Sequence, residues 1–200
     1  VFRFSCELYK TVNKDLLQKA TEDTLEEFDI FKSILRRGLF WYYLEESDIK
    51  PIVREEYKIP CSLIYQRNNH KLLFEVTYYR NRINLEVFHV LTDGTGAMNF
   101  LKTLVSNYLT LAENVEDSGV DYDASSTQKS DDSFSKYYSG KISSKQENNP
   151  VAYKIVGRKY PDDKLKVING MVDVKKVLEE SHKYNATLTA FLSAVLVKSI

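Results

Sequence analysis

Residue types suited to catalysis are concentrated in one run near the middle of the chain, Phe88-His89-Val90-Leu91-Thr92-Asp93-Gly94-Thr95-Gly96. The run places an imidazole at the end of an expected strand, with an acid and two glycines close behind it. Because histidine titrates near neutral pH, it can accept a proton from a reacting hydroxyl or amine. Loops held by rigid elements are also the usual seat of catalytic groups. His89 is therefore the first candidate for a functional site.

A hairpin is expected to position this histidine. Residues 72–79 and 83–89 are rich in β-branched and aromatic side chains and are joined through Arg80-Asn81-Arg82. On the second strand, one parity and therefore one face is shared by Ile83, Leu85, Val87 and His89. Since that face is otherwise apolar, the pattern predicts that His89 points to the same side as the core, where the strand ends.

The segments before the hairpin predict a strand and two helices. Residues 1–9 alternate loosely and are typical of a strand, and Asn13 can cap a helix whose apolar residues recur at helical spacing as far as Phe28. A second short helix is expected to carry Phe31, Ile34 and Leu35, with Gly38 as a left-handed terminator.

An aromatic strand is expected next, over residues 39–44. Its run Phe40-Trp41-Tyr42-Tyr43 is interpreted as sheet core rather than as an aromatic platform for a substrate.

After the glycines, an amphipathic helix is indicated by Phe100, Leu101, Leu104, Val105 and Tyr108. Residues 112–150 are polar and poor in aliphatic side chains, so they predict a long surface excursion with one helical turn near 134–138. A strand over 165–172 and a helix from Asp173 to near Asn185 follow. A last helix, opened by Thr187 or Thr189, is apolar nearly all round, which predicts burial.

Taken together, the elements predict an α/β fold. The order β-α-α-β-ββ-α-loop-β-α-α mixes hairpin strands with helices, which indicates a two-layer α/β sandwich with a mixed sheet. Because the apolar last helix ends abruptly at Ile200, we expect a further C-terminal portion. The start at Val1 rather than methionine likewise indicates residues upstream.

Composition excludes several other classes of protein. The 200 residues suit one domain or one lobe, and 28 basic residues balance 28 acidic ones, so no global field favours nucleic acid. The longest apolar stretch, residues 188–200, is shorter than the ~20 residues that cross a bilayer. Cys6 and Cys61 make neither a metal spacing nor a disulfide framework, so we expect no metal and a cytoplasmic setting.

His89-x-x-x-Asp93-Gly94 resembles the HxxxDG signature of the chloramphenicol acetyltransferase-like superfamily, which includes alcohol acetyltransferases and nonribosomal peptide condensation domains. The resemblance extends to the hairpin before the motif, the helix after it, and the passages 165–170 and 185–192. It implies an N-terminal lobe over 1–186 and the start of a C-terminal lobe over 187–200, so the chain spans only about the first half of a typical two-lobe member.

This resemblance implies an acyltransferase that uses acyl-CoA as co-substrate, with no tightly bound cofactor and a small alcohol or amine as acceptor. His89 would be the general base. Asp93 would brace the loop against an arginine, with Arg3, Arg36, Arg37 or another arginine as alternatives. Gly94 would let the backbone turn, whereas Gly96 is interpreted as part of a turn and helix entrance.

Two departures from the family pattern bear on activity. Many members carry a second histidine just before the base, and that position is Phe88 here. The DFGWG-like loop of the C-terminal lobe is absent, and coenzyme A recognition would lie largely on that lobe. We therefore expect this polypeptide alone to be inactive and to need the C-terminal lobe as partner; an oligomer is left open.

The sequence leaves a second function open and disfavours a third. A non-catalytic binding or docking module is the alternative hypothesis, favoured by Phe88 and the missing lobe. A cysteine hydrolase using Cys61 and His89 is disfavoured, because Cys61 is expected to be a small buried hydrophobe. His70 and His182 are expected to be solvated.

Overall fold

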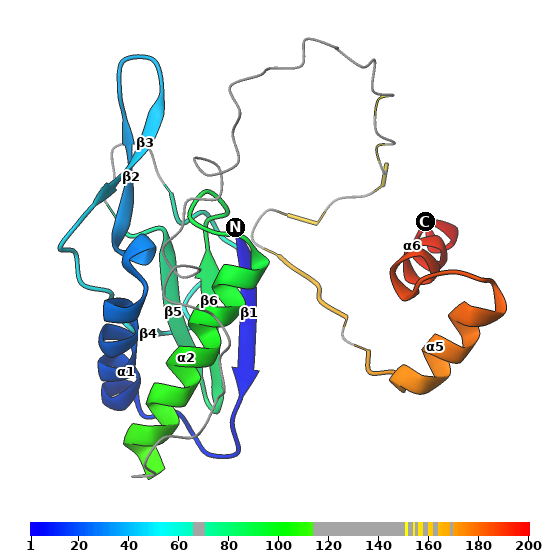
Figure 1. Cartoon of the computed structure of the whole chain (residues 1–200), viewed down its shortest axis with the longest axis horizontal. Helices are drawn as coiled ribbons and strands as arrows, with labels where there is room; N and C mark the ends of the chain where they lie inside the picture. Colours follow the sequence, from blue (N-terminus) through cyan, green and yellow to red (C-terminus); the bar gives the residue numbers. More distant parts are fainter. Residues whose placement is uncertain are drawn as a thin grey trace. The chain divides into compact units, whose positions relative to one another are not determined.

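The computed structural model describes residues 1–65, 71–113, 151, 154, 156–157, 160–161, 164–168 and 170–200. The chain forms two compact units, Val1–Ile142 and Ser143–Ile200, and each is described by itself (Figure 1).

The first unit is built on a mixed four-stranded sheet in the order β1-β6-β5-β4. Three strands, β1 (Phe2–Glu7), β6 (Arg82–Val87) and β5 (Phe74–Tyr79), are antiparallel neighbours, whereas β4 (Arg54–Glu55) runs parallel to β5. Helices α1 (Lys14–Glu27) and α2 (Gly94–Glu113) pack together, α2 contacts β1 and β6, and buried residues of both helices share one core cluster with the sheet. The predicted two-layer α/β sandwich with a mixed sheet is thus confirmed for this unit.

The strand register gives the sheet two chemically different faces. Leu85 lies opposite Phe4 and Val76, and the apolar face that these pairs form is continued by Phe2, Cys6, Phe74, Tyr78, Ile83 and Val87. This face packs into the core with Phe31 and with the α2 residues Phe100, Leu101 and Leu104. The opposite face carries Arg3, Ser5, Glu75, Thr77, Asn84 and Glu86. Period-two alternation therefore separates a hydrophobic layer from a polar one.

Several local predictions are confirmed. Asn13 caps α1, and its side-chain oxygen accepts from the backbone N–H groups of Asp15 (2.9 Å) and Leu16 (3.2 Å). The hairpin of β5 and β6 turns through Arg80-Asn81, where Arg80 adopts φ 54°. The helix predicted after the glycines is α2, and its buried residues are Ala97, Phe100, Leu101, Leu104 and Tyr108.

The predicted second helix is wrong beyond its first turn. A short 3₁₀ turn, η1 (Asp29–Lys32), leads directly into strand β2 (Ser33–Arg37), which pairs with β3 (Tyr42–Glu46). Gly38 does not adopt a left-handed φ and lies in the connecting turn, where its N–H donates to the Trp41 carbonyl at 2.7 Å. The adjacent aromatic segment offers a pairing partner, and this pairing outweighs the helical spacing of three apolar residues.

The aromatic run 40–43 is not sheet core, contrary to the prediction. All four of its side chains are exposed, because the run starts in the turn and enters a strand that, among the strands the structure describes, pairs with β2 alone.

The second unit contains two helices. Helix α5 (Val174–Lys183) begins after Asp173, whose carboxylate accepts from the Lys176 N–H at 3.1 Å, and α6 (Leu188–Ser199) begins after Thr187, whose hydroxyl accepts from Ala190 at 3.2 Å. Both helix starts agree with the sequence prediction.

Two other predictions for this unit are wrong. Described residues 164–168 and 170–173 form no strand, since no neighbouring strand in the described part of the chain pairs with them. No side chain of α6 is buried in this unit, although its composition predicted burial.

The expected polar excursion falls almost entirely outside the described residues, as do its helical turn near 134–138 and His70. Its first two residues, Ala112 and Glu113, instead complete α2. No helix in the described ranges combines the length and the apolar character that crossing a bilayer requires.

Candidate functional site

His89 lies in a tight turn between β6 and α2. Strand β6 ends at Val87, and Phe88 still donates its N–H to the Leu73 carbonyl at 2.8 Å. The Leu91 N–H then donates to the Phe88 carbonyl at 2.9 Å, which closes the turn around His89 and Val90. The imidazole is therefore carried by a backbone that is hydrogen-bonded on both sides of it.

The side chain of His89 is exposed, and the side of the sheet to which it was predicted to point stays a prediction. Strand β6 ends at Val87, so the regular alternation of the strand does not extend to His89. The ring of Phe2 packs edge-on against the imidazole with the ring centroids 5.0 Å apart. The imidazole thus has an aromatic wall on one side and solvent access, as a proton acceptor requires.

Asp93 is the N-cap of α2. Its Oδ1 accepts from the Gly96 N–H at 2.9 Å, and its carbonyl accepts from the Ala97 N–H at 3.1 Å. Among the described residues Asp93 makes no ion pair: Arg3 is bound by Glu56 and Glu86, and Arg36 by Glu45. No arginine within the described ranges therefore braces Asp93, which fixes the loop through the start of the helix.

The glycine that the packing requires is Gly96 rather than Gly94. Gly94 has no left-handed φ, and a Cβ added there would meet the Phe4 ring at an ordinary 3.9 Å. A Cβ on Gly96 would overlap the Thr92 hydroxyl. The interpretation of Gly96 as a helix entrance is confirmed, whereas the sharp turn expected at Gly94 is not needed.

Among the described residues, neither cysteine forms a hydrogen bond with His89. Cys61 is exposed, contrary to the prediction of burial, because it sits at φ 60° in a turn where its N–H donates to Glu86 Oε1 at 2.7 Å. Cys6 lies on the apolar face of β1, where burial, with a contribution from Glu7, raises the pKa of its thiol. A raised pKa keeps this thiol protonated at neutral pH.

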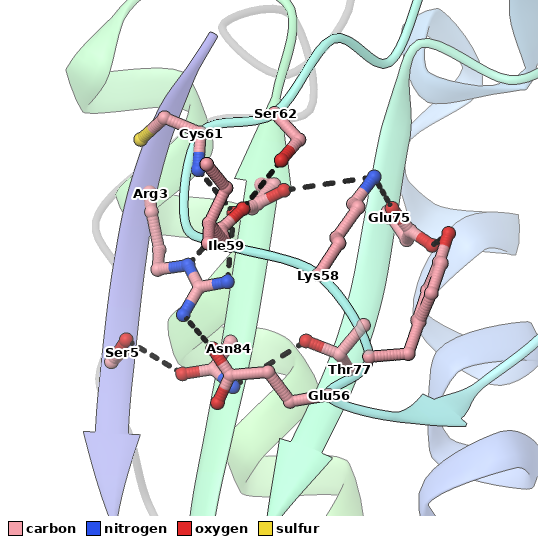
Figure 2. Close-up of polar contacts among 12 residues, drawn as sticks. Arg3, Ser5, Glu56, Lys58, Ile59, Cys61, Ser62, Glu75, Thr77 and Asn84 are labelled. Carbon is pink, nitrogen blue, oxygen red and sulfur yellow. Dashed lines mark hydrogen bonds and ion pairs between the residues drawn. The ribbon is translucent and has the colours of Figure 1, made fainter. Parts of the chain in front are cut away.

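A network of charged side chains occupies the polar face of the sheet (Figure 2). Glu86 is 1% exposed and accepts from Arg3 Nε at 2.8 Å. Arg3 also binds Glu56, which accepts in addition from Arg82 Nη2 at 2.8 Å. Arg3 therefore binds two glutamates, and Glu56 binds two arginines.

Figure 2 shows that a segment over residues 56–62 crosses this face. Lys58 pairs with Glu75, and its Nζ lies 4.0 Å from Glu86 Oε2, an oxygen with no hydrogen-bond partner among the described groups. Beside them, Tyr57 donates to Glu75 Oε1 at 2.8 Å. The segment is thus held on the sheet mainly by charged side chains.

The charges in this network perturb each other's titration. Burial alone would raise the pKa of Glu56, but hydrogen bonds from Arg3 and Arg82 outweigh it and the pKa is lowered. Burial would lower the pKa of Lys58, but the hydrogen bond to Glu75 outweighs it and the pKa is raised. The lowered pKa of Glu56 and the raised pKa of Lys58 both favour the charged form of these two groups near neutral pH.

The strand residues of this polar face could be predicted from the sequence, whereas those of the crossing segment could not. The alternating positions Arg3 and Ser5, Glu75 and Thr77, and Asn84 and Glu86 all have the parity opposite to the apolar residues. Glu56 and Lys58 come from an irregular segment, and no periodicity places them on the sheet. Within the described ranges, no three histidine, cysteine or acidic side chains are grouped as metal ligands.

No family model and no curated protein matches this chain. Among solved structures it is similar to the starter condensation domain of rhizomide synthetase RzmA, with a TM-score of 0.46 and 11% identity over 61% of this chain and 35% of that one. It is also similar to SgcC5 from Streptomyces globisporus, with a TM-score of 0.44 and 13% identity over 57% of this chain and 31% of that one.

A third similar structure is VibH, described as an NRPS condensation enzyme, with a TM-score of 0.41 and 17% identity over 58% of this chain and 31% of that one. The chain spans about a third of the length of these proteins.

Proposed function

We propose that this chain is the part of an acyl-CoA-dependent acyltransferase that supplies the general base, His89. The observation that supports the proposal most directly is the exposed imidazole at the end of β6, in a turn that Asp93 fixes to the start of α2. A group that accepts a substrate proton must be reachable from solvent and must be held in one place. His89 meets both requirements.

The proposed reaction is a direct transfer within a complex of both substrates. A ring nitrogen of His89 takes the proton of the acceptor hydroxyl or amine while the acceptor oxygen or nitrogen bonds to the thioester carbonyl carbon. The carbon–sulfur bond then breaks, and the imidazolium returns its proton to the departing thiolate. No acyl-enzyme is needed, since no nucleophile adjoins His89 among the described residues.

The remaining parts of the proposal follow the HxxxDG resemblance. Acyl-CoA is the co-substrate, a small alcohol or amine is the acceptor, and a C-terminal lobe that carries most of the coenzyme A contacts is the partner. Activity is therefore to be sought in the longest natural polypeptide that contains these residues.

The test compares His89→Ala with His182→Ala in that polypeptide, by following release of free thiol from acyl-CoA in the presence of an acceptor. Loss of a general base should lower kcat by about 10²–10⁴-fold. His182 is exposed on α5, so its replacement is the matched control and should leave the rate unchanged. Equal rates for the two variants would remove His89 from the mechanism.

A non-catalytic docking module is the second candidate. One observation favours it: within the described residues neither ring nitrogen of His89 has a hydrogen-bond partner to fix its tautomer, whereas an orienting partner is usual for a catalytic histidine. If thiol release is undetectable with every acceptor class while folding is intact, this second function is supported.

A further inference from the structure

The β2–β3 hairpin projects from the first unit as a separate ribbon (Figure 1). Its strands form a two-stranded sheet of their own. The bridge between Ile34 and Leu72 ties its base to the residues just before β5. Buried Ser33 and Ile34 lie at this base, and along β2 burial falls steadily toward Arg37.

The end of the hairpin is a two-residue turn made of large apolar side chains. Because Gly38 donates to the Trp41 carbonyl, Leu39 and Phe40 alone occupy the apex. Such turns ordinarily use glycine, asparagine, aspartate or proline. Leu39 and Phe40 are each 89% exposed and Trp41 is 65% exposed, so they contribute little to folding. A turn that departs from these residue preferences without gaining buried contacts is expected at a functional surface.

Both faces of the ribbon are apolar near this end. Tyr42 and Tyr43 are consecutive strand residues and therefore point to opposite faces, yet they are 53% and 45% exposed. A flat protein surface would cover one of these faces and leave the other in water. An environment that surrounds the whole tip buries both at once, and the interfacial layer of a lipid bilayer is such an environment.

The charges on the hairpin are ordered along its length. The segment from Arg36 to Leu44 contains two arginines and no acid, whereas Glu45 and Glu46 pair opposite Ile34 and Ser33 at the base. Arg36 binds Glu45, but Arg37 is exposed and makes no ion pair with any described residue. A cation is therefore presented next to the aromatic tip, where it complements anionic lipid headgroups.

The dimensions agree with this arrangement. At about 3.4 Å per residue, the apex lies roughly 7–10 Å beyond the pair formed by Arg37 and Tyr42. Apolar groups of interfacial segments enter the boundary between headgroups and acyl chains by about 5–10 Å. When Leu39 and Phe40 reach that boundary, Arg37 and Tyr42 lie at the level of the phosphates, where tyrosine, tryptophan and arginine are favoured.

We propose that the tip of the β2–β3 hairpin, residues 38–43, docks this protein on the surface of a bilayer that contains anionic lipid. Leu39, Phe40 and Trp41 enter the interface, and Arg37 contacts the headgroup phosphates. The attachment is peripheral and reversible, and it is independent of the acyl-transfer proposal.

The chain carries its own probe for this proposal, because Trp41 is its single tryptophan. The full 200-residue chain would be titrated with vesicles of phosphatidylcholine and phosphatidylserine (3:1). Trp41 emission should shift to shorter wavelength, and brominated acyl chains should quench it. Vesicles of pure phosphatidylcholine should be bound more weakly.

Matched variants assign the contact to the tip. The double variant L39S/F40S should raise the apparent dissociation constant for vesicles by about tenfold or more, because two exposed apolar side chains are lost from the interface. Ile52→Ser, at a residue that is 61% exposed outside the hairpin, is the control and should bind like the unmodified chain. Arg37→Gln should weaken binding to the anionic vesicles only.

Three outcomes would overturn the proposal. Emission that does not respond to either vesicle would exclude docking. Co-sedimentation with vesicles while Trp41 stays unquenched would place the membrane contact elsewhere, for example on the exposed α6. A short-wavelength emission that depends on protein concentration and not on lipid would show that the tip binds a second copy of the chain. Because the substituted side chains are exposed, all variants should fold normally, and circular dichroism would verify this.

Discussion

Adjacent residues of β6 show two ways of holding the same sheet together. Leu85 is fully buried and packs through the apolar face among the helices, whereas Glu86, its neighbour, is 1% exposed and faces the charged network under residues 56–62. The apolar face gains from every methylene removed from water and needs no exact partner. The charged face gains only while each charge keeps its partners. The two faces should therefore respond differently to substitution and to pH.

The largest effect is expected on the apolar side. Leu85→Ala should lower the free energy of unfolding by about 3–5 kcal/mol, because the helices above it cannot close the resulting cavity. Urea denaturation followed by circular dichroism would measure the change. A loss below about 1 kcal/mol would mean that this side of the sheet is loosely packed, which would contradict the first half of the comparison.

A smaller loss is expected on the charged side. Glu86→Ala should cost about 2–3 kcal/mol, near the lower end of the cost of breaking a buried pair, since Arg3 retains Glu56 while the Cys61 N–H loses its acceptor. Glu55→Ala on exposed β4 is the control and should change stability by less than about 0.5 kcal/mol. If both glutamate variants behave alike, the network does not stabilise the unit.

Acid should act on the charged side alone. The pKa of Glu56 is lowered from its ordinary value of 4.5 in the folded chain, so its contribution to stability is fully present above about pH 4.5. This contribution is lost as the pH falls through the lower, folded pKa. Thermal unfolding between pH 7 and pH 3 should therefore show a steeper acid decline for the unmodified chain than for Glu56→Gln.

For Lys58, the pH dependence of stability has the opposite sign. Its raised pKa means that its contribution is present below its ordinary value of 10.5 and is lost only as the pH rises through the higher folded value. Lys58→Met should therefore leave the acid decline in place and flatten the alkaline one.

Parallel acid curves for Glu56→Gln and the unmodified chain would show that Glu56 gains nothing from its arginine partners.

The two faces also differ in how far the sequence predicts them. The apolar face, the β5–β6 hairpin and the cap at Asn13 follow from period-two alternation and short-range hydrogen bonding, both of which are visible in the residue order. The pairing of Arg3 with Glu56 joins residues 53 apart, and that of Arg3 with Glu86 joins residues 83 apart. Such partners depend on the tertiary fold, and no local pattern specifies them.

The candidate site shows the same limit at shorter range. The histidine, the acid and the following helix were predicted, but β6 ends at Val87, two residues earlier than the apolar pattern indicates, so His89 lies in a turn rather than in the strand. Strand β2 was missed for a related reason: the helical spacing of Phe31, Ile34 and Leu35 does not reveal that Tyr42–Glu46 lies beside them. For β2, pairing with a neighbouring strand decided the structure.

The smallest predicted effect separates the two roles considered for Asp93. As the N-cap of α2, Asp93 can be replaced by asparagine, whose side-chain oxygen still accepts from Gly96, so Asp93→Asn should change stability by less than about 0.5 kcal/mol. Asp93→Ala removes the acceptor and should cost about 1 kcal/mol. If Asp93 instead formed an ion pair with an arginine, both variants would lose the negative charge and should be destabilised to a similar extent. Equal losses in thermal unfolding would therefore support an ion pair, whereas a loss confined to the alanine variant would show that Asp93 holds the His89 turn by capping the helix.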